Sequence, residues 1–452
     1  MTPPSLSRVS SISRARTAAF DILLRVVRHN AYASELLYSG RHSSLSSADH
    51  RLATQIVQGV LRWRSRLDEE IAAASSRPLE KLDPEVLEAL RVGTYQLVYL
   101  DRIPRHAIIN ESVGLVKRAR KNSAAAFVNA VLRKLSKPDT RLASAAAGDQ
   151  AGTLSQRFAH PPWLIDRWMA EFGEQTAARI CAYNQHPPPT AIRLRDPDAA
   201  QELRDAGVKY SPGSLVSVAR VVDFGDVTRT GAFEQGRVLI QDEASQLIAA
   251  LLGRGRRLLD CCSAPGGKTS FLADRNPDSP ILAVEVHPHR ARLTRKLVRQ
   301  TNVHVVCADV CQLPIVSNFD RVLVDVPCSG TGTLARNPEI KWRLKPEDLA
   351  ELALRQLAIL ESSMRHVAPG GRLLYSSCSL EPEENRGVVA RALAKSRHFK
   401  LISMREQLEG LADQGDLSWP DLDSLLEGDY LRTVPGIHPC DGFFAAVIAR
   451  DE

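Results

Sequence analysis

The second half of the chain alternates short apolar runs with helical segments, which is the pattern of a parallel sheet with crossover helices. The apolar runs that predict strands lie at residues 257–260, 281–284, 303–306, 321–324 and 372–375. The helices predicted between and after them lie at residues 268–274, 290–299 and 346–366. The pattern indicates a doubly wound α/β domain. In that architecture ligands bind beyond the carboxyl ends of the strands, so chemistry is expected there.

An acidic residue ends or follows each of the first four predicted strands. These residues are Asp260, Glu285, Asp309 and Asp325. Solubility does not explain the repetition, because the four positions line one crevice of the sheet. Glu285 stands eighteen residues past Gly267, where an acid can bind both hydroxyls of a ribose.

The first of these strands runs into a loop that contains Gly266 and Gly267, just before a predicted helix. Adjacent glycines there allow a tight turn and a close approach to a ligand, although a plain turn is the simpler explanation of the pair alone. A phosphate-binding P-loop would need glycine where Cys262 stands, and the dinucleotide fingerprint is absent. A positively charged nucleoside without phosphates fits the acidic crevice better. S-adenosylmethionine is such a ligand.

Two cysteines occupy matched positions just past neighbouring strand ends. Cys328 follows the fourth strand and Cys378 the fifth, each in a loop rich in Ser, Gly or Thr. Neighbouring strands lie about 5 Å apart, so the two thiols can flank one substrate. A single cysteine there would more often be inert packing, but the matched pair favours catalysis.

Paired thiols suit methylation at carbon 5 of cytosine. A thiolate that adds to carbon 6 turns carbon 5 into a nucleophile, which splits one difficult step into two easier ones. A hydrogen bond at ring nitrogen 3 would help, and Asp325 is placed to supply it. A base must then remove the carbon-5 proton so that the adduct can eliminate. Methylation of amino groups or oxygen needs none of this.

The first 140 residues predict a bundle of about five helices. Phe20, Leu23, Leu24 and Val27 form an apolar stripe at i, i+3, i+4 and i+7, and similar stripes recur to Leu132. This segment holds 22 Lys and Arg against 13 Asp and Glu, a net charge of +9, whereas the remainder holds 37 against 39. The asymmetry favours a polyanionic partner, with a solvated helical surface as the alternative.

Between the two regions, residues 137–155 read as a linker without periodicity. A smaller mixed unit follows, with a helix at 163–172, strands at 190–194 and 215–222, and a helix at 199–206. Its function cannot be read from its residues.

Composition excludes several classes of protein. No apolar run is long enough for a membrane span, and the first 16 residues lack the apolar core of a signal peptide. Those residues are rich in Ser and Arg, so a transit peptide remains the alternative to a cytoplasmic protein. The eight cysteines form no C-x-x-C pair, so we expect reduced thiols and no metal site.

The helical region resembles the NusB-type RNA-binding domain. The resemblance rests on three runs, namely Val60-Leu61-Arg62, Ile103-Pro104 with Ile109-Asn110-Glu111, and residues 127–133, Phe-Val-Asn-Ala-Val-Leu-Arg.

The α/β region resembles the RNA 5-methylcytosine methyltransferases. The motifs are Gly-Gly-Lys-Thr after a strand, Asp-Val-Pro-Cys-Ser-Gly-Thr-Gly at 325–332, Asn-Pro-Glu-Ile-Lys-Trp-Arg at 337–343 and Ser-Cys-Ser-Leu-Glu-Pro-Glu-Glu-Asn at 377–385. Together with the NusB-like front, the chain is similar to the RsmB/Sun (Fmu) family of small-subunit ribosomal RNA methyltransferases. One departure is Ser377, where the family usually has Thr before the nucleophile.

The resemblance implies an all-α NusB-like domain at 1–140, a small α+β RNA-binding subdomain at 156–235, and a Rossmann-like class I methyltransferase domain at 236–452. It places the nucleophile at Cys378 and the adduct-releasing cysteine at Cys328, with Asp325 beside them. The implied S-adenosylmethionine site comprises Cys262, Ser263, Ala264, Pro265, Gly266, Gly267, Lys268, Glu285, Asp309 and Asp325. We expect 16S ribosomal RNA as the partner and a monomeric protein.

Target recognition is less legible. The best RNA-binding candidates follow the Cys328 loop, and they are Arg336, Lys341, Trp342 and Arg343. Two other functions stay open. One is an inactive, antitermination-like RNA scaffold, against which the intact cysteines argue. The other is a DNA cytosine-5 methyltransferase, in which the Pro-Cys thiol would be the attacker, but Cys378 and the basic helical region argue against it.

Overall fold

The computed structural model describes residues 12–37, 44–137, 152–314 and 318–452. Two compact units divide these residues. The helical unit consists of Met1–Gln185 together with Arg336–Arg343, and the α/β unit consists of His186–Ala335 and Leu344–Glu452. Most of the predicted linker, residues 138–151, lies outside the described residues. The predicted domain limits stay predictions.

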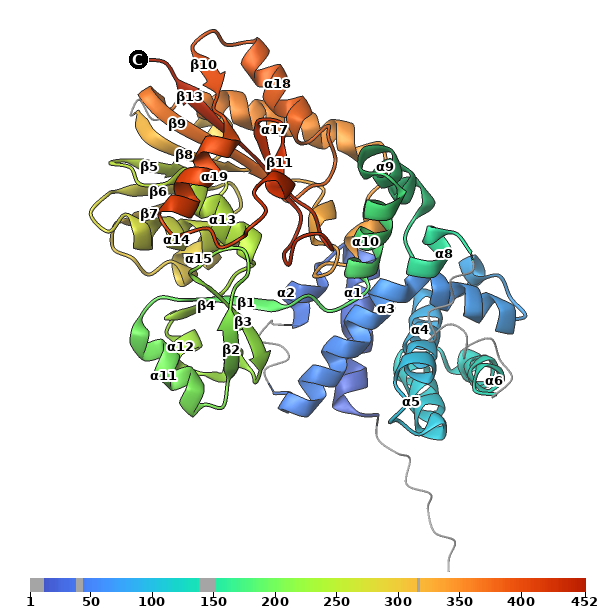
Figure 1. Ribbon diagram of the computed structural model, residues 1–452. Coiled ribbons are helices and arrows are strands. Elements are labelled where there is room, and N and C mark those ends of the chain that lie inside the picture. Colours follow the sequence, from blue (N-terminus) through green and yellow to red (C-terminus); the bar gives the residue numbers. More distant parts are fainter. Residues whose placement is uncertain (1–11, 38–43, 138–151, 315–317) are drawn as a thin grey trace, which may run out of the picture. The chain divides into compact units, whose positions relative to one another are not determined.

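The described part of the helical unit is built from helices (Figure 1). They are α1 (Arg14–His29), α2 (Ala33–Leu37), α3 (Ser47–Ala74), α4 (Pro84–Tyr99), α5 (Arg105–Arg118), α6 (Ala125–Leu135), α8 (Leu154–Phe158), α9 (Pro162–Phe172) and α10 (Glu174–Asn184). Ser13 and Ser46 cap α1 and α3 by accepting backbone N–H groups of the first turn. The predicted stripe of α1 is buried except for Val27, which is 39% exposed because Val26 takes the buried position at that end of the helix.

A four-stranded antiparallel sheet begins the α/β unit, with strand order β2-β3-β1-β4. Its elements are β1 (Thr190–Leu194), α11 (Pro197–Asp205), β2 (Lys209–Pro212), β3 (Ala219–Phe224), α12 (Gly231–Glu234) and β4 (Val238–Ile240). The strand predicted at 215–222 begins only at Ala219, because the chain first turns back from β2, an edge strand that the apolar pattern did not reveal. Asp274, which lies outside this sheet but in the same α/β unit, anchors the sheet because its carboxylate forms ion pairs with Arg193 and Arg195.

The large sheet has the order β11-β12-β13-β9-β8-β5-β6-β7, and β10 pairs with β13. Its strands are β5 (Leu258–Asp260), β6 (Ile281–Glu285), β7 (Val303–Cys307), β8 (Phe319–Asp325), β9 (Val367–Ser377), β10 (Phe399–Leu401), β11 (Leu426–Glu427), β12 (Tyr430–Thr433) and β13 (Phe443–Arg450). Five neighbouring strands, in the sheet order β7-β6-β5-β8-β9, pair in parallel, as predicted. The chain reverses its direction of winding at β5, which has β6 on one side and β8 on the other, and such a point is where open α/β sheets bind ligands.

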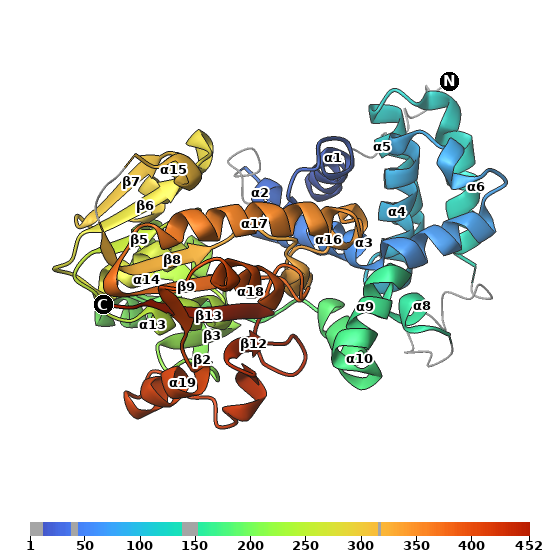
Figure 2. The same ribbon diagram turned by 90° about the horizontal axis from the view of Figure 1, so that it is seen from above.

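Helices cover both faces of this sheet (Figure 2). One face carries α13 (Glu243–Leu252), α14 (Gly267–Arg275) and α19 (Met404–Asp413), and the other carries α17 (Asp348–Met364) and α18 (Arg386–Ala394). Side chains alternate between the two cores, as the period of two along a strand requires. Leu323 packs with the first group of helices, whereas Val322 and Val324 pack with the second. Both faces of β8 are therefore packed up to the residue before Asp325.

Candidate active site

The carboxyl ends of β5, β6, β8 and β9 bring most of the predicted site residues to one edge of the sheet. The register pairs Asp325 at the end of β8 with Ser376 near the end of β9. Cys328 and Cys378 follow within three residues of those positions. The loop after β5 contains the predicted cofactor residues 262–268 and leads directly into α14.

The loop after β5 makes the tight turn that its glycines predict. Gly266 has a φ of +110°, and a Cβ at this position would approach Cγ2 of Val298 to 2.9 Å. Only glycine meets both demands. The backbone N–H of Ser263 donates to Val284 O at 2.9 Å, which ties the loop to β6. The first turn of α14 thus lies beside the strand ends.

Glu285 and Asp309 lie at the ends of β6 and β7. Glu285 is 4% exposed, and its Oε1 accepts the N–H of His287 at 2.9 Å. Asp309 is exposed and caps a short helix by accepting the N–H of Cys311 at 2.9 Å. Glu285 is therefore held in a fixed orientation, whereas Asp309 faces solvent.

Asp260, at the end of β5, is a buried acid beside this edge. Its Oδ2 accepts the hydroxyl of Thr269 at 2.6 Å. Burial raises the pKa of Asp260 to about 7, with the nearby Asp325 adding to the shift and the Thr269 hydrogen bond opposing it. This side chain ties the first turn of α14 to the end of β5.

Lys268 and Asp325 form an ion pair within the crevice, at 2.8 Å between Nζ and Oδ2. Ser376 donates to the other carboxylate oxygen at 2.8 Å. Burial disfavours the charged ammonium, but the charge and hydrogen bond of Asp325 outweigh it and raise the pKa of Lys268. The ammonium also lies 4.8 Å from the ring centroid of Phe443. Asp325 is thus fixed from two sides.

The sulfur atoms of Cys328 and Cys378 lie 3.1 Å apart. Both residues are half-buried. The hydrogen bond with Cys378, and then burial, raise the pKa of the Cys328 thiol. Cys261 and Cys262 also lie at this edge, directly after β5, and burial raises the pKa of each. The edge therefore presents two adjacent thiols next to a fixed carboxylate.

Close backbone packing holds the two cysteine loops together. The N–H of Gly332 donates to Cys378 O at 2.9 Å, and the N–H of Gly442 donates to Gly332 O at 2.8 Å. A Cβ on Gly332 would lie 2.1 Å from Gly442 O, so the motif position admits only glycine.

Comparisons with known proteins match these features. The sequence matches the family 16S rRNA methyltransferase RsmB/F over residues 250–449 and the NusB family over residues 13–137. A ribosomal RNA small subunit methyltransferase B of Vibrio cholerae is 30% identical over 97% of this chain and 98% of its own length. The chain belongs to the RsmB/F methyltransferase family. A putative methyltransferase of Mycobacterium tuberculosis is 34% identical over 100% of both chains.

The family match confirms the resemblance and the fold class predicted from the sequence. Residues 160–223 match the ferredoxin-like domain of RsmF/B-like methyltransferases, which identifies the small sheet. The crystal structure of PH0851 shares the fold, with a TM-score of 0.79 and 24% identity over 98% of this chain and 99% of that one. The protein is therefore a ribosomal RNA methyltransferase with a NusB domain, and RNA is its substrate class.

The four predicted RNA-binding residues of this RsmB/F chain lie on a segment that packs within the helical unit. Lys341 is 1% exposed and donates to Arg62 O at 2.9 Å. Trp342 donates to Leu61 O at 2.6 Å, and Arg343 donates to Asn30 O at 2.8 Å. Burial argues against an RNA contact by Lys341. For the half-buried Arg336, Trp342 and Arg343, RNA binding stays a prediction.

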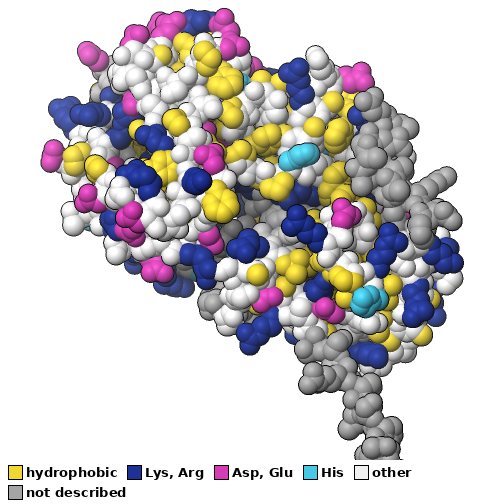
Figure 3. Space-filling view, turned by 60° about the horizontal axis from the view of Figure 1, so that its bottom comes forward, with side chains coloured by type: hydrophobic (Ala, Val, Ile, Leu, Met, Phe, Trp, Pro, Cys, Tyr) yellow, Lys and Arg dark blue, Asp and Glu magenta, His cyan; other side chains and the backbone are white. Residues whose placement is uncertain are grey.

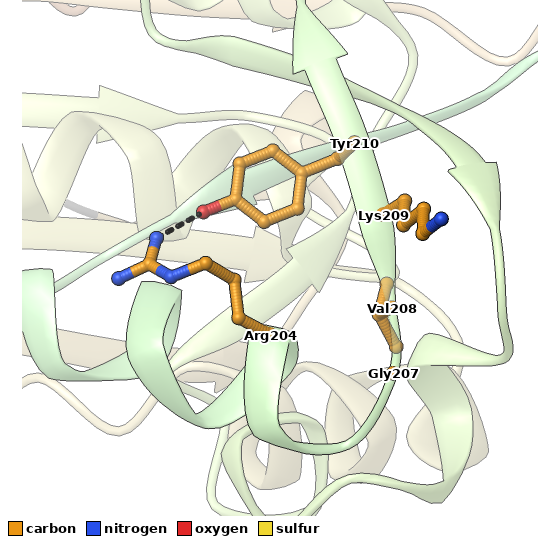
Figure 4. A pocket seen from close by; sticks show the side chains of 5 residues that line it. All are labelled: Arg204, Gly207, Val208, Lys209 and Tyr210. Atoms are coloured by element: carbon orange, nitrogen blue, oxygen red, sulfur yellow. Dashed lines mark hydrogen bonds between the residues drawn. The ribbon is translucent and has the colours of Figure 1, made fainter.

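Lys and Arg side chains are scattered over the face seen in Figure 3. A hollow of about 450 Å³ lies on the small sheet, where Arg204 reaches the Tyr210 hydroxyl at 3.3 Å (Figure 4). Among the described residues, no cluster of His, Cys, Asp and Glu could hold a metal ion, and no helix is long and apolar enough to cross a membrane.

Two features of the site are not evident from the sequence. The ion pair between Lys268 and Asp325 joins residues 57 positions apart. Glu384 lies between the cysteine loops, and in the sequence it stands out only as one letter of a motif. One sequence signal could have indicated Glu384: an acidic run follows the Ser-Cys-Ser loop within a few residues. No periodicity marks such a contact.

Proposed function

We propose that this chain transfers a methyl group from S-adenosylmethionine to carbon 5 of a cytosine in small-subunit (16S) ribosomal RNA, through a covalent adduct between Cys378 and carbon 6. The observation that carries the proposal is the pair of thiols 3.1 Å apart at the ends of neighbouring parallel strands. Methylation of oxygen or of an amino group has no use for a second thiol so placed.

The crevice fits the proposed methyl donor by the chemistry of its groups. Glu285 is a fixed acid at the end of β6, suited to the hydroxyls of a ribose. The turn at Gly266 lets the backbone after β5 approach a ligand closely. The donor supplies an electrophilic methyl group on a sulfonium. The residues that would hold it are those of the loop 262–268 with Glu285, Asp309 and Asp325.

Each side chain at the thiol pair then has a defined task. The thiolate of Cys378 forms a bond to carbon 6, which makes carbon 5 nucleophilic toward the methyl group. As that bond forms, ring nitrogen 3 takes up a proton, and the carboxylate of Asp325, fixed by Lys268 and Ser376, is oriented to accept its hydrogen bond. Cys328 acts in release: as a thiolate it takes the carbon-5 proton, and the bond between carbon 6 and Cys378 then breaks, which leaves Cys378 as a thiolate and, with loss of the nitrogen-3 proton, restores the aromatic ring. A target base inside a stem must first be unstacked.

A denaturing gel tests the two cysteine roles. Cys328→Ala should attack RNA but fail to release it, and so accumulate a protein–RNA species that survives denaturation. Cys378→Ala and the double variant should form none and show no methyl transfer. A DNA-type mechanism predicts the reverse assignment, with a trapped species from Cys378→Ala alone. Bisulfite sequencing of ribosomal RNA with and without the gene identifies the modified cytosine, and an unchanged pattern would contradict the proposal.

Calorimetry on the full chain tests the cofactor site. Glu285→Ala should weaken S-adenosylmethionine binding by about 1–3 kcal/mol, the range for a hydrogen bond to a charged group. Asp278→Ala, a change at an exposed acid in the turn before β6, at the opposite end of that strand from Glu285, serves as the matched control. Equal affinity of Glu285→Ala and the control would remove the ribose assignment.

We further propose that the basic helical unit binds RNA phosphates. Lys117 and Arg120 are exposed at the end of α5. Changing both to Gln should weaken RNA binding and reduce the salt dependence of the dissociation constant, by a slope of roughly 0.7–0.9 for each phosphate that the protein no longer neutralises. An unchanged slope would mean that these charges only solvate the surface.

A further inference from the structure

Glu384 is a buried acid in the loop after Cys378, directly before α18. Its carboxylate is 0% exposed and accepts hydrogen bonds from both cysteine loops. Oε1 accepts the backbone N–H of Ser329 at 2.8 Å, and Oε2 accepts the hydroxyls of Ser329 and Ser379, the latter at 2.5 Å. Ser329 directly follows Cys328, and Ser379 directly follows Cys378. One carboxylate thus binds the residue after each thiol.

Neighbouring side chains complete this network. Gln356 of α17 donates to Glu384 Oε1 at 2.7 Å and to Pro327 O, just before Cys328, at 3.0 Å. Asn385 accepts the hydroxyl of Ser377 at 2.5 Å and donates to Ser379 O at 2.9 Å. The backbone on both sides of each cysteine is therefore fixed, and Glu384 is the acceptor common to the two loops.

We propose that Glu384 is a positioning residue that sets the spacing of the Cys328 and Cys378 thiols. The hydrogen bonds of its carboxylate join it to Ser329, Ser379 and Gln356, so it acts on the thiols through Ser329 and Ser379. The inference rests on the proposed function for its catalytic meaning, since the spacing serves both the attack by one thiol and the release by the other. The geometric part, a thiol separation set by a shared carboxylate, can be tested without RNA.

The charge of Glu384 adds a second effect on Cys328. The groups facing this thiol are Cys378, Asp325, Glu384 and Tyr375, with Lys268 facing Cys378. After the Cys378 hydrogen bond, burial and the Cys378 charge, the charge of Glu384 also raises the pKa of Cys328. Glu384 therefore helps to keep Cys328 in its thiol form while Cys378 attacks.

Disulfide formation measures the thiol spacing directly. Diamide takes two electrons and two protons from the pair, which joins the sulfur atoms and leaves the reagent as a hydrazine. In the full-length Glu384→Ala variant, which lacks the shared acceptor, the Cys328–Cys378 disulfide should form at least tenfold more slowly, as followed by peptide mass spectrometry. Methyl transfer should fall by at least as much. Glu383→Ala, at the exposed neighbouring acid, should match the wild type in both.

A folded Glu384→Ala protein that forms the disulfide at the wild-type rate would overturn the proposal. This result is distinguishable from a failure of the proposed function, because the disulfide assay uses neither RNA nor methyl donor. A slowed disulfide with no cytosine methylation in any variant would instead retain the positioning role and reject the reaction.

Glu384→Gln decides the matter if the alanine variant does not fold. The amide keeps the size of the side chain but has one acceptor oxygen where the carboxylate has two, so the Cys328–Cys378 disulfide should form more slowly than in the wild type. It removes the negative charge, so alkylation of Cys328 by N-ethylmaleimide should shift to lower pH. An alkylation profile identical to that of the wild type would contradict the role of Glu384.

Discussion

Two lysines of the described residues, the half-buried Lys268 and the buried Lys341, differ in their surroundings. Lys268 in the crevice of the α/β unit has the carboxylate of Asp325 at 2.8 Å, and its pKa is raised. Lys341 in the helical unit has the carbonyl of Arg62 as its hydrogen-bond acceptor, and burial lowers its pKa well below the ordinary value. Both belong to motifs that resemble those of the same family.

The difference lies in the partner of each ammonium: Lys268 is paired with a carboxylate, whereas Lys341 is hydrogen-bonded to a backbone carbonyl. A buried cation stays charged when an anion compensates for the lost water, and it loses its proton readily when only a carbonyl does. The crevice therefore holds a charged lysine, because the carboxylate of Asp325 compensates for the water that the ammonium has lost. The segment Arg336–Arg343, in contrast, is held by hydrogen bonds to backbone carbonyls, including those of Leu61 and Arg62.

Removing the charge of Lys268 should have the largest effect. Lys268→Met leaves Asp325 without its cation, so the carboxylate that we propose to bind the base loses a fixed partner. We expect methyl transfer to fall by roughly 10²–10³-fold, the usual cost of losing a preorganised electrostatic group. Single-turnover methylation measures it, with thermal unfolding to confirm the fold. Lys268→Arg keeps the ion pair and should retain more activity. Equal losses in both variants would show that the charge is not what matters.

The second prediction concerns Asp260, whose native pKa of about 7 exceeds the unfolded value of about 3.9. Between these values the native state binds a proton that the unfolded chain does not. The stability that this gives is fully present below pH 4 and is lost as the pH rises through 7. About three pKa units correspond to about 4 kcal/mol.

Asp260→Asn should remove this pH dependence, because an amide does not titrate while its oxygen still accepts from Thr269. Urea unfolding followed by circular dichroism at pH 5 and pH 8 measures the effect. The wild type should lose more stability than the variant between these values, and Asp278→Asn should behave as the wild type does. Parallel changes in wild type and Asp260→Asn would rule out the raised pKa.

The strands around the crevice were predictable because their residues are locally patterned. The boundaries of β6 and β7 differ from the prediction by one residue each, since both read as apolar runs. The thiol pair was predictable for a related reason: parallel strands end at one edge, so Cys328 and Cys378 had to meet there. The pattern did not reveal β10 to β13, several of which are short, and pairing between distant segments leaves no local signal.

The contacts of the segment after Cys328 were not predictable for the same reason. Trp342 donates to Leu61 O, a residue 281 positions away. From the sequence, an exposed basic segment beside the catalytic loop was a reasonable expectation. The structure instead buries Lys341 within the helical unit. The hydrogen-bond partner of Lys341 is the backbone carbonyl of Arg62, and only the complete fold brings that carbonyl close.

A smaller effect is expected for the indole of Trp342. Trp342→Phe keeps an aromatic ring and deletes the hydrogen bond to Leu61 O, so it should cost about 1 kcal/mol of unfolding free energy. Four of the five tryptophans lie in the helical unit, so urea unfolding followed by fluorescence reports on that unit. Trp163→Phe, at a half-buried tryptophan, provides the control. A cost no greater than that of the control would mean that the segment is not anchored through this bond.

The smallest effect is expected at Lys341, where the comparison with Lys268 is sharpest. Lys341→Met fills a similar volume, and Arg62 O keeps a donor because Gln185 also bonds to it, at 3.3 Å. The native pKa lies below the unfolded value of about 10.4, so the unfolded chain binds a proton that the native state does not. Wild-type stability therefore falls as the pH drops from about 10 toward the native pKa, whereas the stability contributed by Met does not change.

At pH 7 the Lys341→Met variant should accordingly be as stable as the wild type within about 1 kcal/mol, or more stable, because a buried ammonium without an anion is replaced by an apolar group. The wild type should gain relative to the variant when urea unfolding is repeated at pH 10. RNA affinity and its salt slope should not change, since the ammonium is shielded from solvent. A reduced salt slope would show that Lys341 reaches phosphate when RNA binds, and the segment would then have to leave the packing described here.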